Sequence, residues 1–422
     1  MKPKIHISRT SAILTILLAA QLQVSADTVA DWNAIAERSI LTAKHPPPVA
    51  ALDLAITQVA IYDAITAIDG RYQPYYVRIP NATGSMDAAG AKAGHDILVN
   101  LFPAQSSQLD ADYEAYLAQH NISLTDPGVT VGAQAAAGIA ALRSNDGRFP
   151  SSQPPFTGGT GPGQWRPTPS YEPGAPASYT PGLTPWVAAV RPFTFNDVGD
   201  YAADGPPALT SAQYTEDFNE VKSVGSRTST TRTPAQTQLA YFWADSGPLM
   251  WQRGLRDIAS RYALSIGDSA RMFALVDLAA ADAQIACWNS KYEYNFWRPI
   301  TAITLADQDG NPNTEADPNW RPLINTPNFP EYTSGHTTSS AAAAEMLETV
   351  LGTKKVEFTI TTTNGLANPK TQTYSNLTDP IRDVIDARIC AGIHYRTSDM
   401  HGVALGKRVA KHAFKNYLRP IR

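Results

Sequence analysis

Three short segments near the C-terminus combine residue types that could hold an oxyanion and move protons around it. Their polar residues, in chain order, are Lys291, Arg298, Ser334, Gly335, His336, Arg388 and His394. The cations, the hydroxyl and the glycine amide all donate hydrogen bonds, and guanidinium groups bind tetrahedral oxyanions in a forked geometry. The two histidines can exchange protons near neutral pH or bond the central atom. The set predicts a site for a phosphate-like anion.

The first segment places Lys291 and Arg298 seven residues apart, a spacing that puts both on one side of a helix ended by Pro299. In isolation, such a pair is usually solvated at the surface. The neighbours here are aromatic and indicate burial: Trp288, Tyr292, Tyr294, Phe296 and Trp297. Because buried cations need an anionic partner, the pair is a candidate for anion binding.

The second segment has the character of a helix N-terminus. Thr333, Ser334 and Gly335 precede an alanine-rich stretch, so free backbone N–H groups and the positive end of the helix dipole would meet the anion. Glycine allows the ligand a close approach to the backbone, and His336 would lie in the first turn, placed for proton transfer. An ordinary serine N-cap beside a chance histidine is the alternative.

In the third segment, Arg388 and His394 lie six residues apart near the end of a predicted helix. Ile389 and Ile393 alternate with small residues, so this stretch is expected to pack inward and to carry its polar residues into the interior. A core histidine bonded to a backbone carbonyl is the alternative.

Taken together, the three segments resemble the signature of the type 2 phosphatidic acid phosphatase and vanadium-dependent haloperoxidase superfamily. That pattern is K-x6-R-P, then P-S-G-H, then S-R-x5-H-x3-D, and all three elements occur here in order. The sequence departs from it at three positions. Thr333 replaces the proline, Ala387 replaces the serine, and Asp399 lies one residue beyond the expected aspartate, so no role is carried onto Asp399.

The resemblance implies roles for the matching residues. The oxygens of vanadate or phosphate would be held by Lys291, Arg298, Ser334, Gly335 and Arg388. His394 would bond the vanadium or phosphorus atom, and His336 would act as acid–base on the apical oxygen or leaving group. In the haloperoxidase branch, Lys291 would also polarise the bound peroxide.

Several features favour the haloperoxidase branch. Soluble acid phosphatases of this superfamily are much shorter, and its lipid phosphatases have several membrane spans. Trp288, three residues before Lys291, and Phe329, seven before His336, match an aromatic pair near the halide site of fungal-type chloroperoxidases. Residues 51–70 and 164–174 are similar to segments of bacterial haloperoxidase-like proteins.

The implied activity is vanadate-dependent oxidation of halide by hydrogen peroxide to hypohalous acid, which then reacts with an organic acceptor. The alternative enzyme is a secreted acid phosphatase, in which phosphate is part of the substrate and His394 forms a phosphohistidine. A third possibility is an exported oxyanion-binding protein without turnover, which the intact His336 and His394 argue against. Halide preference, the acceptor and the oligomeric state are not encoded in any motif.

These residues require a scaffold, and apolar residues at three- and four-residue intervals predict that it is helical. The predicted helices cover residues 27–43, 49–69, 86–102, 106–120, 129–144, 211–224, 234–245, 248–264, 268–292, 337–351, 379–394 and 401–417. Residues 356–374 alternate β-branched and polar residues around Thr363-Asn364-Gly365, which indicates a small β-hairpin. The prediction is an all-α fold of two fused helical bundles around one oxyanion site.

The composition changes between these bundles. Residues 149–207 are rich in proline and glycine but also contain several aromatic residues. A flexible linker is one interpretation; an ordered belt that wraps the helices and lines a pocket is favoured, because linkers rarely keep so many aromatics. The predicted division is therefore a leader at 1–26, an N-terminal bundle at 27–148, the belt at 149–207 and a catalytic region at 208–422.

The first 26 residues have the pattern of a secretion signal, with an uncleaved anchor as the alternative. Lys2, Lys4 and Arg9 precede a short apolar stretch, and residues 24–26 are a small-residue cleavage site. Cleavage would change the formal net charge from −4 to −7, which argues against nucleic acid or anionic lipid as a partner. No other long apolar run is expected in the sequence, so the mature protein is predicted to be soluble and periplasmic or extracellular.

Only two cysteines occur, Cys287 and Cys390. An exported protein could oxidise them to a disulfide. Both lie in helix-like segments next to the first and third motifs, so buried free thiols are the preferred prediction.

Overall fold

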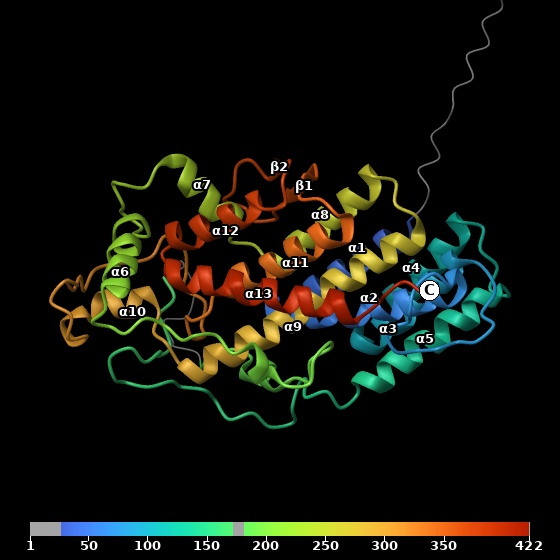
Figure 1. Cartoon of the computed structure of the whole chain (residues 1–422), viewed down its shortest axis with the longest axis horizontal. Helices are drawn as coiled ribbons and strands as arrows, with labels where there is room; N and C mark the ends of the chain where they lie inside the picture. Colours follow the sequence, from blue (N-terminus) through green and yellow to red (C-terminus); the bar gives the residue numbers. More distant parts are fainter. Residues whose placement is uncertain (1–26, 172–180, 422) are drawn as a thin grey trace, which may run out of the picture.

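The computed structural model describes residues 27–171 and 181–421, and there the chain is predominantly helical (Figure 1). These ranges contain thirteen α-helices, four short 3-10 helices and one two-stranded sheet. The expected all-α fold with a small β-hairpin is confirmed. The predicted signal peptide lies outside the described residues.

Five helices form the N-terminal bundle, drawn in blue to teal at one end of the molecule in Figure 1. They are α1 (Thr28–Ala43), α2 (Pro47–Asp69), α3 (Met86–Leu101), α4 (Ser106–Gln119) and α5 (Pro127–Arg143). Side chains satisfy free N–H groups at several starts: the Asp27 carboxylate accepts from the Val29 N–H of α1, and the Ser85 hydroxyl accepts from the Asp87 N–H of α3. Helix α2 is at the centre of this bundle and packs against α1, α3 and α5.

Helix α2 corrects one expectation from the sequence. Among the described residues it is the one helix with the length and apolar composition of a membrane span, and 89% of its most apolar window is buried inside the fold. A helix that is apolar on every side is expected where other helices surround it. Contacts with α3 and α5 on one side and with α8 and α9 on the other account for its composition.

The remaining helices form the C-terminal region. They are α6 (Ala212–Val224), α7 (Pro234–Phe242), α8 (Gly247–Arg261), α9 (Ile266–Tyr294), α10 (Pro299–Thr304), α11 (Gly335–Leu351), α12 (Asp379–Cys390) and α13 (Arg396–Asn416). Helix α9, 29 residues long, is capped by the Ser265 hydroxyl and runs through the middle of the molecule (Figure 1). It packs on α2 of the first bundle and on α11 and α13 of the second.

Because α9 contacts both groups of helices, one hydrophobic core extends from Val29 in α1 to Leu418 after α13. The two bundles are therefore fused through a shared helix. The domain boundary at residue 148 stays a prediction.

The described parts of the belt contain two short 3-10 helices, Pro185–Ala189 and Val198–Tyr201, and otherwise follow the outside of the helices (Figure 1). The carboxylate of Asp282 in α9 accepts hydrogen bonds from the backbone N–H groups of Phe193 at 2.6 Å and Thr194 at 2.8 Å. The N–H of Trp165, whose side chain is fully buried, donates to the carbonyl of Asn295 at 2.7 Å. The described parts of the belt are thus anchored to the end of α9 that carries the first motif.

The predicted hairpin consists of β1 (Phe358–Thr361) and β2 (Thr371–Tyr374), paired antiparallel with Thr361 opposite Thr371. The connection is longer than the expected turn and covers residues 362–370. Strand β1 packs against α8, and the guanidinium of Arg253 in α8 donates to the Thr361 carbonyl at 2.8 Å. The hairpin therefore lies against the helices around the candidate site.

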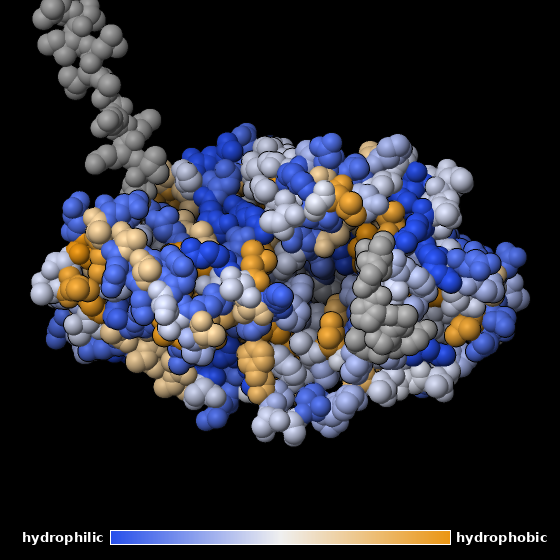
Figure 2. Space-filling view, turned by 180° about the vertical axis from the view of Figure 1, so that it is seen from behind, coloured by the Kyte–Doolittle hydropathy of each residue, from blue (hydrophilic) through white to orange (hydrophobic). Residues whose placement is uncertain are grey.

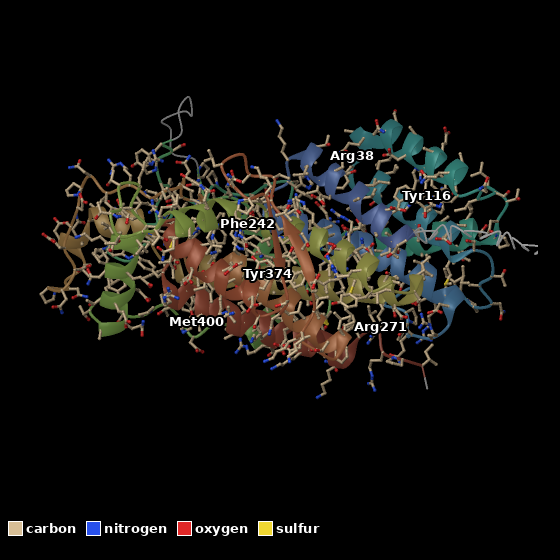
Figure 3. The ribbon with its side chains drawn as sticks, turned by 90° about the horizontal axis from the view of Figure 1, so that it is seen from above. Arg38, Tyr116, Phe242, Arg271, Tyr374 and Met400 are labelled. Atoms are coloured by element: carbon tan, nitrogen blue, oxygen red, sulfur yellow. The ribbon has the colours of Figure 1, made fainter. Side chains whose placement is uncertain are left out.

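Viewed from above, Arg38 and Tyr116 mark the N-terminal helices, whereas Phe242, Tyr374 and Met400 mark the C-terminal region (Figure 3). On the face shown in Figure 2, hydrophobic residues occur singly or in small groups among hydrophilic ones. This distribution is usual for a folded domain and marks no extended apolar patch on that face.

Candidate active site

The first motif is not a single helical face, and this corrects the sequence interpretation. Helix α9 ends at Tyr294 because Asn295 takes a left-handed conformation with φ of 49°. Arg298 lies in the extended segment beyond this cap, and Pro299 begins α10 instead of ending α9. Asparagine tolerates the left-handed region better than most residues, and proline suits the first position of a helix. Lys291 and Arg298 are brought together by this turn of the chain.

Arg298 is fully buried and holds the ends of two loops. Its Nε donates to the Phe329 carbonyl at 2.9 Å, and its Nη1 donates to the Ile393 carbonyl at 2.8 Å and to Nε2 of His394 at 3.0 Å. Nη2 is buried and, among the described residues, has no hydrogen-bond partner. Burial lowers the pKa of the guanidinium to about 10, which leaves it charged at neutral pH.

Lys291 is also fully buried, but its ammonium group is already engaged. Nζ donates to the carbonyls of Pro330 at 3.1 Å and Glu331 at 2.9 Å, and also to that of Thr333. Burial lowers the pKa of Lys291 to about 8. An ammonium has three hydrogens, so Lys291 holds the segment before the second motif and has no donor left for an anion.

The second motif begins α11 as expected, and the helix starts at Gly335, two residues before the predicted start. Ser334 is the N-cap residue; its buried hydroxyl has no well-formed hydrogen bond within the described chain and lies beside the carboxyl of Asp399. A Cβ added at Gly335 would come within 3.1 Å of the Trp288 ring, so this position favours glycine. The Gly335 carbonyl is held by the side-chain amide of Gln284 at 2.8 Å.

His336 lies in the first turn of α11 and lines a pocket. Its Nε2 is 2.9 Å from the backbone carbonyl of Asp245, which can only accept, so Nε2 carries the proton and Nδ1 is left as a base. Burial and the positive charge of Arg388 lower the pKa of His336 to about 3. The carboxylate of Asp245 accepts from Arg253 Nη1 at 2.9 Å and from the Thr363 N–H at 2.7 Å, which fixes the carbonyl that His336 contacts.

The third motif contributes Arg388 and His394 from either side of the end of α12. This helix ends at Cys390, earlier than predicted, and Gly392 with φ of 79° turns the chain back so that His394 faces inward. Arg388 donates from Nη1 to the Trp243 carbonyl at 3.0 Å, whereas its buried Nε has no partner among the described residues. Burial lowers the pKa of Arg388 to about 10.

His394 is held on both ring nitrogens. Nδ1 is 2.7 Å from Oε1 of Glu331, and Nε2 is 3.0 Å from Nη1 of Arg298. Burial, together with the charge of Arg298, places the pKa of His394 well below its ordinary value. Glu331 is fully buried, and burial raises its pKa to about 7.

Sequence reasoning missed both Glu331 and Asp245. Neither residue belongs to the motif pattern, and Asp245 is 91 positions away from His336 in the chain. The proximity of Glu331 to the second motif was the one available signal.

A cavity of about 300 Å³ joins these groups. Its lining residues include Trp288, Phe329, Gly335, His336, Arg388 and His394, together with Pro46, Pro47, Pro48, Leu183, Pro248, Ile324 and Pro327. The rings of Trp288 and Phe329 are 5.1 Å apart between centroids and form an apolar wall. Lys291 and Arg298 do not line the cavity, but their charged groups lie 5.2 Å and 4.9 Å from the centroid of the Phe329 ring, and Arg298 contacts His394.

Asp399, Thr333 and the two cysteines lie next to the motif residues. Asp399 is fully buried, its carboxyl oxygens have no well-formed hydrogen bond in the described chain, and burial places its pKa well above the ordinary value. Cys287 and Cys390 are free and buried, as predicted. The Thr333 hydroxyl, at the position of the superfamily's proline, contacts the thiol of Cys287 at 3.4 Å.

Comparison with known proteins agrees with this geometry. Residues 271–422 match the family described as the VCPO second helical-bundle domain. The chain is also 32% identical over 180 residues to the vanadium chloroperoxidase of Curvularia inaequalis, a match covering 35% of this chain and 29% of that protein. The family match thus covers the C-terminal part of the chain, which carries all three motifs.

Solved structures extend the likeness of fold to most of the chain. A bacterial vanadium-dependent iodoperoxidase superposes with a TM-score of 0.76 and 24% identity, covering 93% of this chain and 95% of that one. The holo form of a bacterial vanadium-dependent chloroperoxidase gives a TM-score of 0.71 and 18% identity, covering 87% and 91%. These matches show that the chain has the helical fold of vanadium haloperoxidases.

Proposed function

We propose that this protein is a vanadate-dependent haloperoxidase that oxidises halide with hydrogen peroxide. The observation that carries the proposal is a pair of buried donors without hydrogen-bond partners in the described chain, Arg298 Nη2 and Arg388 Nε. Both arginines lie next to His394, and because buried donors are normally paired, the two free nitrogens indicate a missing acceptor. An oxyanion such as vanadate has the charge and the oxygen atoms to supply it.

The residues assigned to the cofactor follow from these contacts. Arg298, Arg388, Ser334 and the N–H groups at the start of α11 would hold the oxygens, and Nε2 of His394 would bond the metal. Vanadate, when bound, supplies a Lewis acid that activates hydrogen peroxide toward halide.

The chain's own contribution begins with His336. Its neutral ring presents Nδ1 as a base, which can take a proton from hydrogen peroxide entering the pocket and return it to a leaving oxygen. The main role of Lys291 is to position residues 330–333, because its ammonium group donates all three hydrogens to carbonyls of this loop. Direct polarisation of peroxide by Lys291 would require release of one of these bonds.

Trp288 and Phe329 are proposed to form the halide pocket. Their rings line the cavity beside His394 and Arg388 and limit the access of water, which strengthens the attraction between an anion and the arginines. Halide and peroxide are both small enough for a cavity of about 300 Å³. The natural organic acceptor and the preferred halide are left to the assay.

The test compares purified protein with and without orthovanadate. One assay follows bromide- and iodide-dependent halogenation with hydrogen peroxide, and a parallel assay follows hydrolysis of an aryl phosphate. We expect halogenation that requires vanadate and is lost in His394→Ala. Phosphate hydrolysis inhibited by vanadate, without halogenation, would instead identify an acid phosphatase that binds phosphate at the same oxyanion site.

The His336→Ala variant separates an enzyme from a binding protein. Loss of this base should abolish turnover while orthovanadate still binds, since His336 donates nothing to the anion in the arrangement described. If the wild type binds orthovanadate but catalyses neither reaction, the protein is an oxyanion-binding member without turnover.

We also propose that the protein is exported by its N-terminal 26 residues. The basic residues, apolar stretch and small-residue site of the sequence support this proposal. Mass spectrometry of the protein from its native host should give a mature N-terminus at Asp27, and fractionation should recover it outside the cytoplasm. An intact N-terminus in the cytoplasmic fraction would refute export.

A further inference from the structure

The buried carboxylate of Glu331 is the one acidic side chain that contacts a histidine of the candidate site in the described chain. Its Oε1 accepts from Nδ1 of His394 at 2.7 Å and from the backbone N–H of Tyr395 at 3.1 Å. Both the glutamate and the histidine are shielded from solvent, with 0% and 2% exposure of their side chains. A hydrogen bond in such surroundings is strong and directional.

The two nitrogens of His394 give consistent evidence about its proton. Nε2 lies 3.0 Å from Nη1 of Arg298, and a guanidinium can only donate, so Nε2 must be the acceptor. A neutral imidazole then carries its proton on Nδ1, where Oε1 of Glu331 is placed to accept it. Glu331 therefore favours the tautomer whose Nε2 is unprotonated, so that an anion's central atom could take the place of the Arg298 N–H at this nitrogen.

Glu331 is itself fixed from several directions. Its N–H donates to the Phe296 carbonyl at 2.9 Å, and its carbonyl accepts from Nζ of Lys291 at 2.9 Å. Its second carboxylate oxygen lies near the hydroxyl of Ser398. The contacts made by Lys291 thus set the position of the carboxylate that orients His394.

The superfamily pattern places an aspartate four residues after this histidine, and here that position is Ser398. Asp399, one residue later, makes no hydrogen bond to His394 in the described structure. The carboxylate next to His394 comes instead from Glu331, just before the second motif and three residues before Ser334.

We propose that Glu331 is a positioning residue for oxyanion binding, which orients His394 so that Nε2 bonds the central atom. Partners of this kind fix the ring and the tautomer of a metal-binding histidine, and their loss typically costs about 10- to 100-fold in affinity. The inference deepens the proposed function, since it concerns the same site, but it applies equally if the anion is phosphate.

The experiment measures binding of orthovanadate, and separately of inorganic phosphate, by titration calorimetry without peroxide or halide. Glu331→Ala should weaken both by about 10- to 100-fold. Glu331→Gln keeps an oxygen that can accept from Nδ1 and should stay within a few-fold of the wild type. Glu345→Ala, which removes a carboxylate paired with Lys407 and Lys411 on the surface, is the matched control and should bind as the wild type does.

Two further measurements distinguish orientation from general stabilisation. With 15N-labelled histidine, NMR should show His394 protonated on Nδ1 in the wild type and in Glu331→Gln, and mixed or shifted to Nε2 in Glu331→Ala. The double variant Glu331→Ala/Ser398→Asp moves the carboxylate to the position that the superfamily pattern prescribes, and it should recover part of the lost affinity.

The inference is overturned if Glu331→Gln loses as much affinity as Glu331→Ala, because the carboxylate would then act through its charge. It is equally overturned if His394 keeps its proton on Nδ1 in Glu331→Ala. If Glu331→Ala fails to fold, the NMR and affinity results for Glu331→Gln and the double variant decide. A wild type that binds orthovanadate but does not halogenate would refute the proposed function and leave this inference standing.

Discussion

Replacement of Arg388 by methionine should separate anion binding from folding. In the described structure its guanidinium makes one hydrogen bond, from Nη1 to the Trp243 carbonyl at 3.0 Å, while its buried Nε is unpaired. Methionine is similar in length and removes a guanidinium charge whose burial lowers its pKa, with Asp399 attracting this charge and Arg298 repelling it. The protein without anion should therefore lose little stability, since the cost of one unpaired carbonyl is offset by no longer burying that charge.

Arg388→Met should weaken the binding of an oxyanion much more than it weakens the fold. A hydrogen bond between charged partners contributes about 1.5–3 kcal/mol. At about 1.4 kcal/mol per factor of ten, Arg388→Met should weaken orthovanadate binding about 10- to 150-fold. Titration calorimetry gives the affinity, and thermal unfolding of the anion-free protein gives the change in stability.

Arg143→Met is the matched control, because Arg143 is an equally buried arginine outside the site. It is paired with the Asp146 carboxylate at 2.9 Å and donates to the Arg191 carbonyl at 2.8 Å. Breaking a buried ion pair typically costs about 3–5 kcal/mol. Arg143→Met should thus destabilise the fold while the folded fraction binds orthovanadate normally. Wild-type affinity in Arg388→Met would refute the assignment of Arg388 to the anion.

Three other predictions follow from buried groups in the described chain. Lys291→Met should lower the free energy of unfolding by about 3 kcal/mol or more, because three carbonyls lose their donor at about 1–3 kcal/mol each; unchanged urea denaturation would contradict this. Burial raises the pKa of Asp277 to about 8, so the wild type should lose stability relative to Asp277→Asn as pH rises from about 4 to 8, by about 1.4 kcal/mol per pH unit. Stability falls with rising pH because folded Asp277 keeps a proton that the unfolded state releases. Parallel pH profiles of unfolding for the wild type and Asp277→Asn would disprove this prediction. Finally, a thiol reagent should label Cys287 and Cys390 only after denaturation and without prior reduction, whereas labelling that requires a reductant would indicate a disulfide.

The sequence predicted most helices because their signals are local. Ser85, Ser265 and the prolines at helix starts act within one turn of their own position, and apolar spacing identifies the buried faces. The left-handed conformation of Asn295 could not be foreseen, since asparagine occurs in helices and at their ends alike. One such residue changed the geometry of the first motif from a helical face to a turn.

The site residues were predictable as a set, but their partners were not. Motif order identifies Arg298, Arg388 and His394, whereas the contact between His394 and Glu331 joins positions 63 residues apart. Nothing in the spacing of charges indicated that the ammonium group of Lys291 would donate all three of its hydrogens to backbone carbonyls. Such contacts depend on the path of loops in three dimensions, which local patterns do not specify.

Helix α9 packs against both groups of helices, which limits where the chain can be divided. The matched family region begins at residue 271, inside α9 (Ile266–Tyr294), and this helix is buried between α2 on one side and α11 and α13 on the other. A truncated protein that begins there would lack the first turn of its central helix and would expose the apolar surface that α2 covers. Such a fragment is expected to aggregate, although it contains every motif residue. Shorter versions of this protein should therefore be sought by shortening loops, not by removing the N-terminal helices.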